Sequence, residues 1–227
     1  MKKKKVICIG EALIDRIRNK SNKGFTDFLG GAPANVACAL RKLKIDSIFI
    51  GSLGSDDYGK KFIMQFNELD VNLDFLQLNN DSSTRVVNVE RDQFGDRFFA
   101  GFEASSKSCF ADESFSNKLT EKELQNLDKF FVESKYLVTG TNVLSSPISA
   151  KTIDFLIERA NKFEVKIIID LNWREVFWDN SRFSSEISKE MRVNLIKEFL
   201  NHADVLKLAK EEATLFFENE NPLLISR

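Results

Sequence analysis

Short apolar runs alternate along the chain with longer segments in which apolar residues recur every three or four positions. The short runs end at glycine or at polar residues and are typical of buried strands. The longer segments carry one apolar face and predict amphipathic helices. We expect strands at 6–9, 47–50, 75–78, 136–139, 166–169 and 205–208, and helices at 34–43, 58–69, 153–160 and 187–199.

Strands that alternate with helices of this length predict a three-layer α/β/α fold, in which helices cover both faces of a parallel sheet. Two segments interrupt the alternation. Residues 12–28 are polar and strand-like without a crossover helix, and residues 85–102 predict a hairpin that turns at 93–96. We expect these segments to form a small β-sheet beside the main sheet, inserted in a single domain that spans residues 1–227.

The composition excludes several classes of function. The chain has 227 residues, of which 43% are hydrophobic, and a formal net charge of -1. This near-neutral balance is not typical of proteins that bind nucleic acid or anionic membranes. No apolar run approaches the roughly 20 residues of a membrane span. We therefore expect a cytoplasmic protein without nucleic-acid or membrane partners.

Cysteine and histidine content argues against a metal centre or a disulfide framework. Cys8, Cys38 and Cys109 are an odd number of cysteines and lie far apart in the sequence, and His202 is the single histidine. Neither set has the spacing of a zinc site. We expect the cysteines to be buried in a reducing cytoplasm.

The strongest local motif is GGAPANVA at 30–37, where two glycines immediately precede a predicted helix. Gly30 and Gly31 allow the backbone to approach a ligand closely and to offer its N–H groups. Asn35, one turn into the helix, can present its amide to a hydroxyl-rich ligand. From these residues alone, an ordinary strand-to-helix turn is an equally good interpretation.

Two further segments place charged side chains after predicted strands. Asp15 follows the first strand, and its carboxylate can accept hydrogen bonds from two sugar hydroxyls. The sequence DLNWR at 170–174 closes another strand, and Arg174 can meet an anionic phosphate there. The alternatives are a solvated loop aspartate for Asp15 and a surface ion pair for Arg174.

Taken in order, these segments resemble the ribokinase/PfkB family of carbohydrate kinases. GEALID at 10–15 resembles the family's opening strand with its sugar-binding aspartate. Residues 30–37 resemble the family's first signature in the form that is typical of fructokinases. GSLGSDDYG at 51–59 resembles the next turn, and 85–102 resembles a lid hairpin over the sugar. DLNWR at 170–174 with Phe177 and Trp178 resembles the fructokinase pattern after the central strand.

The resemblance implies a ribokinase-like fold with a β-sheet lid and an ATP-dependent kinase that phosphorylates a sugar hydroxyl with the help of Mg²⁺, with fructose as the expected sugar. It implies sugar contacts from Asp15, Gly30, Gly31, Asn35, Arg85 and Phe98. It implies nucleotide or phosphate contacts from Asn172, Arg174, Lys207 and Glu212, of which Glu212 also acts on magnesium through water. It further implies a homodimer through the lid, whose hairpin carries Phe94, Phe98, Phe99 and Phe102.

The sequence departs from the family in its last third. The family's second signature, with a glycine-rich anion turn and the base aspartate, has no match, and the last of the ten glycines is Gly140. Ala209 replaces an asparagine of the family's Asn-x-x-Glu motif. We therefore expect a C-terminally truncated fold without a catalytic residue.

Three interpretations of the activity stay open. The chain is an incomplete fructokinase, a non-catalytic sugar-binding remnant, or one half of a split kinase that a partner chain completes. Fructose is not distinguished here from related keto-sugars or sugar acids.

Overall fold

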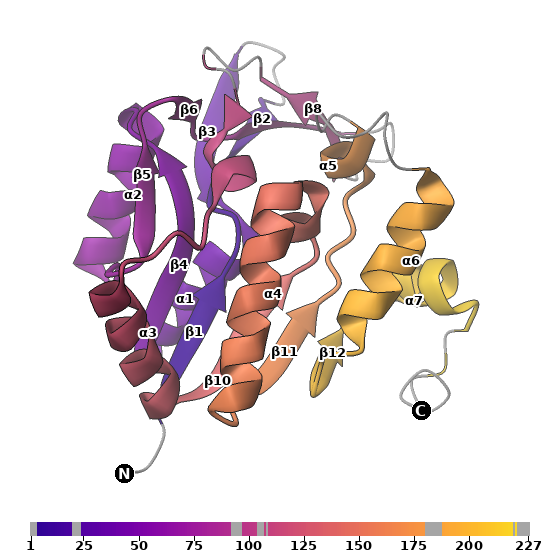
Figure 1. Ribbon diagram of the computed structural model, residues 1–227. Coiled ribbons are helices and arrows are strands. Elements are labelled where there is room, and N and C mark those ends of the chain that lie inside the picture. Colours follow the sequence, from indigo (N-terminus) through magenta and orange to yellow (C-terminus); the bar gives the residue numbers. More distant parts are fainter. Residues whose placement is uncertain are drawn as a thin grey trace.

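The computed structural model describes residues 4–19, 24–91, 97–103, 107, 109–179, 188–219 and 221. Its main sheet has six strands in the order β12-β11-β10-β1-β4-β5, and all neighbouring strands pair in parallel. Helices flank this sheet, and a smaller sheet lies at one end of it (Figure 1). The predicted α/β architecture is therefore confirmed.

All six predicted strands are present in the main sheet. They are β1 (Lys5–Ile9), β4 (Ser47–Gly54), β5 (Leu76–Asn79), β10 (Ser134–Gly140), β11 (Lys166–Asp170) and β12 (Val205–Lys207). The predicted helices correspond to α1 (Ala32–Lys42), α2 (Asp57–Glu68), α4 (Pro147–Lys162) and α6 (Lys189–Leu200). The sequence analysis missed three helices: α3 (Glu121–Glu133), α5 (Glu175–Asp179) and α7 (Lys210–Phe217).

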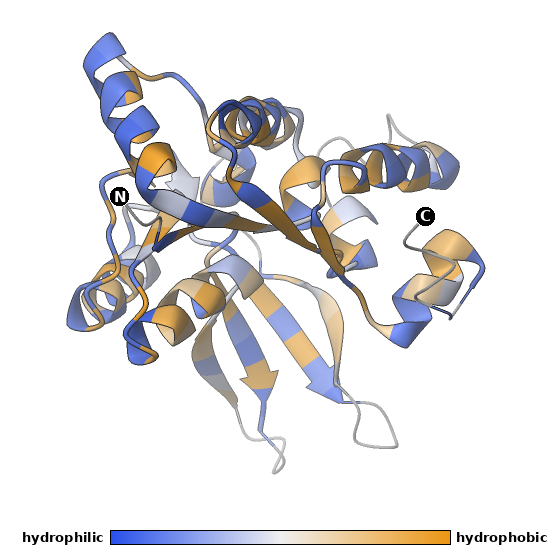
Figure 2. Ribbon diagram, turned by 90° about the horizontal axis from the view of Figure 1, so that it is seen from below, coloured by the Kyte–Doolittle hydropathy of each residue, from blue (hydrophilic) through white to orange (hydrophobic). Residues whose placement is uncertain are grey.

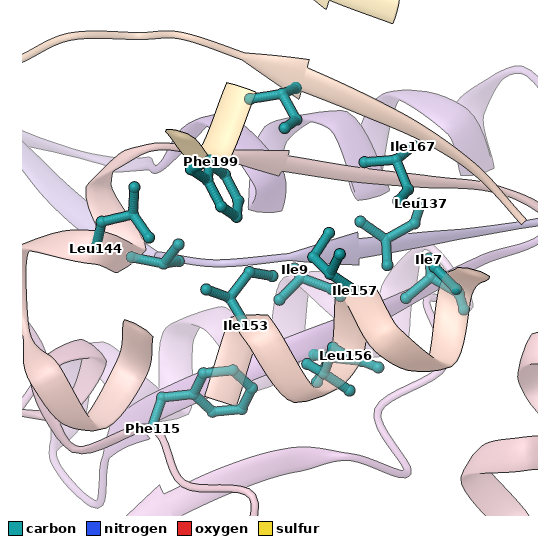
Figure 3. Packing of buried hydrophobic residues seen from close by; sticks show 14 of the residues in the cluster. Ile7, Ile9, Phe115, Leu137, Leu144, Ile153, Leu156, Ile157, Ile167 and Phe199 are labelled. Carbon is teal, nitrogen blue, oxygen red and sulfur yellow. The ribbon is translucent and has the colours of Figure 1, made fainter. Parts of the chain in front are cut away.

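Strand β1 is buried on both faces, as expected for a central strand of a parallel sheet. Ile7 and Ile9 pack towards α3 and α4, where they meet Leu137 of β10 and the α4 residues Ile153 and Ile157 (Figure 3). The alternate residues of β1 belong to a second cluster that α1 and α2 cover on the opposite face. The core therefore lies on both sides of β1 and β4.

The second face of the sheet is more open towards β11 and β12. Tyr136, Val138 and Ile168 are only partly buried there. They line a groove of about 360 Å³ together with Val36 and Leu40 of α1, and its lining is almost entirely apolar. The sheet thus has a well-covered end at β4 and a partly uncovered face at β10 and β11.

A separate four-stranded sheet forms where the sequence predicted a second β-layer. It consists of β2 (Leu13–Arg18), β3 (Phe25–Gly30), β7 (Val86–Arg91) and β8 (Arg97–Phe102), in the order β3-β2-β7-β8, and we call it the lid. Hydrophobic and hydrophilic residues alternate along its strands (Figure 2), as expected for a sheet with two different faces. The predicted hairpin turn at 93–96, including Phe94, lies outside the described residues.

Short elements connect the lid to the main sheet. They are β6 (Ser82–Ser83), β9 (Cys109–Phe110) and the 3-10 helices η1 (Ala111–Ser114) and η2 (Asn142–Ser145). Cys8, Cys38 and Cys109 all carry free thiols. Within the described ranges, we find no helix with the length and apolar character needed to cross a bilayer.

Candidate functional site

The site predicted for a sugar forms where β3 leads into α1. Gly30 ends β3, and a Cβ atom at this position would lie 2.4 Å from Oδ2 of Asp15 on the paired strand β2. Gly31 has φ of 95°, and a Cβ atom there would lie 2.4 Å from the carbonyl oxygen of Glu11. Gly31 therefore requires glycine, because its positive φ and the Glu11 carbonyl exclude a side chain, whereas a side chain at position 30 would displace the carboxylate of Asp15.

The N-terminus of α1 has no capping side chain of its own. Gly31 is its N-cap residue, and Pro33 stands in the first turn. The N–H of Ala32 donates to Oε1 of Glu11 at 3.3 Å, and exposed Asn35 lies one turn into the helix. Such a helix start can offer backbone N–H groups and a positive dipole end to a ligand. The structure thus places Asp15, Gly30, Gly31 and Asn35 around the start of one helix.

Arg85 does not point into an open cleft. Its side chain is 1% exposed, and its Nε and Nη2 atoms donate to Asp112 at 2.8 and 3.0 Å. Nη2 also donates to Glu113 at 2.9 Å. The guanidinium lies 4.3–4.9 Å from the centroids of three rings, those of Phe102, Phe110 and Phe177. These contacts tie the start of β7 to η1, to the end of β8 and to α5, and the sugar contact expected for Arg85 stays a prediction.

The register of the lid separates Phe98 from Asp15. Phe99 pairs with Val89, and Val89 pairs with Ile17, two residues after Asp15. Paired residues and residues two apart share a face of a sheet, so Phe99 lies on the face of Asp15. Phe98 lies on the opposite face and is 46% exposed. Phe28, Phe99 and Phe102 therefore lie on the lid face of Asp15, and the sugar contact expected for Phe98 stays a prediction.

The four residues expected to contact the nucleotide lie near the carboxyl ends of β11 and β12. Lys207 pairs with Asp170 at 2.7 Å and is exposed. Arg174 is half-buried, and its guanidinium lies 5.2 Å from the ring centroid of Phe99 in the lid. Asn172 has φ of 41°, a left-handed conformation that asparagine tolerates. This region therefore contacts the lid through Arg174.

Glu212 is buried and uses both carboxylate oxygens on the protein itself. Oε1 accepts the N–H of Trp173 at 2.8 Å, and Oε2 accepts the N–H of Ala209 at 2.7 Å. Glu212 thereby caps α7, where Ala209 lacks a side-chain acceptor, and holds the segment after β11. Across the described ranges, no group of three or more His, Cys, Asp or Glu residues could hold a metal ion.

Glu11 lies directly beside this site and was not predicted from the sequence. Its side chain is buried, and Oε1 accepts from Ala32 N–H and from Asn142 Nδ2, each at 3.3 Å. Burial raises the pKa of this carboxyl to about 7, while its hydrogen bonds and the negative charge of Asp112 make smaller contributions. Its position directly after the glycine that ends β1 was the available signal.

Comparison with known proteins adds to this geometry. Residues 3–223 match the model for "pfkB family carbohydrate kinase". Similar curated proteins include the ATP-dependent 6-phosphofructokinase of Thermoanaerobacterium thermosaccharolyticum, with 24% identity over 97% of this chain and 63% of that protein. The fructokinase of Salmonella typhimurium is 26% identical over 96% of this chain and 64% of its own length.

The fructokinase of Xylella fastidiosa, solved with bound ATP, is a similar structure. It has a TM-score of 0.78 and 28% identity, over 95% of this chain and 64% of that chain. The chain thus spans 63–64% of the length of these three relatives.

Proposed function

The chain belongs to the pfkB family of carbohydrate kinases, and from this premise we propose that its residues form the sugar-binding part of an ATP-dependent kinase that acts on fructose. The observation that carries the proposal is the position of Asp15, whose carboxylate packs against Gly30 at the start of α1. The names of two similar proteins, both fructokinases, support fructose as the sugar.

The chemistry of this corner suits a polyhydroxylated ligand. The Asp15 carboxylate can accept from two hydroxyls, and the amide of Asn35 can donate and accept. Ile17 and Phe99 lie on the lid face of Asp15 and can provide an apolar cover for such a ligand. Holding a sugar hydroxyl in place is the part of phosphoryl transfer that these residues can supply, because this reaction depends mainly on positioning.

We assign the nucleotide side to the ends of β11 and β12. Arg174 can pair with phosphate oxygens through its planar guanidinium, and Lys207 can contribute a mobile positive charge. Magnesium, when bound with ATP, neutralises negative charge on the phosphates. Glu212 acts by holding the backbone of Trp173 and Ala209.

Isothermal titration with D-fructose tests the sugar assignment. We expect Asp15→Ala and Asn35→Ala each to weaken binding by about 10- to 100-fold, since loss of a hydrogen bond to a charged or buried partner costs roughly 1.5–3 kcal/mol. Glu90→Gln is the control, because Glu90 lies in the lid and pairs with Arg18. Titration with fructose 6-phosphate tests whether the chain binds the phosphorylated sugar named for one relative or the free fructose named for the other two. Unchanged fructose affinity in both alanine variants would refute the assignment.

A second candidate is one half of a split kinase. The groove of about 360 Å³ between α1 and the strands β10 and β11 favours it, because parallel sheets are ordinarily covered on both faces. We propose that this groove binds a separate polypeptide that corresponds to the part of the relatives that the present chain does not match. Co-purification with the corresponding segment of the Xylella fastidiosa fructokinase tests this candidate, and Val138→Asp should prevent the association.

We also propose that the lid pairs with the lid of a second copy. Phe25 and Phe98 are 49% and 46% exposed on the lid face opposite Asp15. Exposed aromatic side chains on one surface favour a contact. Light scattering should show a dimer that Phe98→Ser weakens, and a monomer at all concentrations would contradict the proposal.

A further inference from the structure

A small polar cavity lies beside Glu11, between the end of β1, the start of β7 and the helices η1 and η2. Its lining includes the charged residues Glu11, Arg85, Asp112 and Glu113, together with Asn142. The centre of a water molecule can move within about 10 Å³ of this space. That volume is near the lower limit of about 10–15 Å³ for holding one buried water.

Three of these side chains each carry one buried polar atom without a hydrogen-bond partner among the described residues. The atoms are Oε2 of Glu11, Nη1 of Arg85 and Oδ1 of Asn142. The three residues are 3%, 2% and 6% exposed, so bulk water does not satisfy these atoms. Leaving buried polar atoms unpaired costs free energy, and native proteins rarely leave three together.

One water molecule can satisfy all three atoms at once, because it can accept one hydrogen bond and donate two. Arg85 Nη1 can donate to the water oxygen, and the two water hydrogens can be donated to Glu11 Oε2 and Asn142 Oδ1. A metal cation is disfavoured because the Arg85 guanidinium faces the same space. An anion is disfavoured by the carboxylates of Asp112 and Glu113. The donor and acceptor pattern therefore selects a neutral molecule of the size of water.

The same network reaches both parts of the sugar site. Through its other oxygen, Glu11 accepts the N–H of Ala32 at the start of α1. The carbonyl of Arg85 accepts the N–H of Ile14, the residue before Asp15. The Arg85 guanidinium also contacts Phe102 at the end of the lid strand β8. The cavity thus lies between the lid and the turn that contains Gly31.

We propose that this cavity binds one ordered water molecule, and that Glu11 is a positioning residue which, through that water, couples Arg85 at the base of the lid to the Gly31–Ala32 turn. The role of this turn in holding a sugar rests on the proposed function. The water site and the coupling do not need a sugar to be measured.

The first experiment is a high-resolution crystal structure of the wild-type chain with amide hydrogen exchange of Ala32. We expect one water within hydrogen-bond distance of Glu11 Oε2, Arg85 Nη1 and Asn142 Oδ1. Glu11→Met, which has similar length and no hydrogen-bonding carboxylate, should lose the water and accelerate exchange of Ala32 by about 10-fold. Glu11→Gln keeps an oxygen acceptor and a group that can contact the water, so it should restore slow exchange.

A pH titration by NMR separates coupling from simple packing. The Ala32 amide and the Arg85 Nε–H resonances should shift with one common midpoint in the wild type and lose this titration in Glu11→Gln. Arg85, Asp112 and Glu113 are the charged groups that face Glu11, and all three remain in this variant. Ser52→Ala is the control, since Ser52 is buried in β4 outside this network.

The outcomes are distinguishable from a failure of the proposed function. No water, or a metal ion, in the wild-type cavity overturns the inference. Unchanged Ala32 exchange in Glu11→Met, or separate midpoints for Ala32 and Arg85, overturns the coupling. If the wild type binds fructose, Glu11→Met should bind it about 10-fold more weakly, whereas Glu11→Gln and Ser52→Ala should match the wild type. If the wild type does not bind fructose, the sugar proposal fails and the water and exchange data still decide the inference.

Discussion

The two ends of the proposed active site are organised differently. At the sugar end, Asp15 and the glycine turn are supported by a buried network around Glu11 and Arg85. At the nucleotide end, Glu212 bonds to two backbone N–H groups, and Lys207 pairs with Asp170 beside an apolar groove. The proposed sugar end therefore has a buried supporting network behind it, whereas Lys207 and Glu212 at the proposed nucleotide end bond to other groups of the protein. This difference suggests that the present residues bind sugar better than they transfer phosphate.

Turnover should show the largest difference between the two ends. In a coupled ADP-release assay with ATP, Mg²⁺ and fructose, we expect no fructose-dependent rate for these 227 residues, although fructose still binds. The chain has no glycine after Gly140 and hence no glycine-rich anion turn in that part of the sequence. Loss of one preorganised donor already costs about 10²–10³ in rate. Robust turnover that Asp15→Ala abolishes would contradict this prediction.

Substitution of the two arginines tests the same comparison through stability. Arg85→Leu leaves the buried carboxylates of Asp112 and Glu113 without their cation, and we expect a loss of about 3–5 kcal/mol. Arg174→Leu removes a half-buried contact with Phe99 and should cost no more than about 1 kcal/mol. Urea unfolding of both variants measures the difference. Equal losses of unfolding free energy in Arg85→Leu and Arg174→Leu would contradict a stronger network at the sugar end.

The buried Glu11 should make stability depend on pH. Burial raises its folded-state pKa from 4.5 to about 7, so between these values the folded protein keeps a proton that the unfolded chain releases. The contribution of Glu11 to the free energy of unfolding therefore has its full value below pH 4.5 and decreases as the pH rises to about 7. The loss is about 3 kcal/mol, at about 1.4 kcal/mol per pH unit.

Urea unfolding between pH 4.5 and 7.5 measures this slope, which Glu11→Gln should flatten. Asp27→Asn is the control. Its ion pair with Arg16 lowers the pKa of Asp27 below 3.8, so this residue contributes its slope at more acidic pH. A wild-type slope that persists in Glu11→Gln would assign the effect to another group.

Substitution of two glycines should produce the smallest difference between the two ends of the proposed site. In Gly30→Ala, the new methyl group would lie 2.4 Å from Asp15 Oδ2, so the carboxylate must move and fructose should bind about 10-fold more weakly. In Gly140→Ala, the nearest atom is the carbonyl oxygen of Asp170 at 3.4 Å, an ordinary contact, and binding should not change. Titration calorimetry of both variants decides the point. The same fructose affinity in Gly30→Ala and Gly140→Ala would contradict the assignment of Asp15 to the sugar site.

The parts of the site that could be predicted from the sequence are contiguous in it. Gly30, Gly31 and Asn35 belong to one eight-residue motif, and Asp15 lies in β2, the strand after β1. These residues lie near one helix start because β2 and β3 are consecutive strands that pair in an antiparallel way, which brings Asp15 beside Gly30.

The role of Arg85 could not be predicted in this way. Its partners Asp112 and Glu113 lie 27 and 28 residues further along the chain. No local pattern marks such a pair, and only folding brings the charges together. The face of the lid on which Phe98 lies could not be predicted for a related reason, since a shift of one residue in register changes the face of a strand on which a side chain lies.

By itself, the sequence determined the alternation of strands and helices, the separate lid and the glycine turn, because these depend on periodicity and on neighbours in the chain. The tertiary structure alone decided which polar side chains face a ligand and which face the protein. Glu11, Arg85 and Asn142 come from three distant segments, and their hydrogen bonds exist only when β1, the base of the lid, η1 and η2 are packed together.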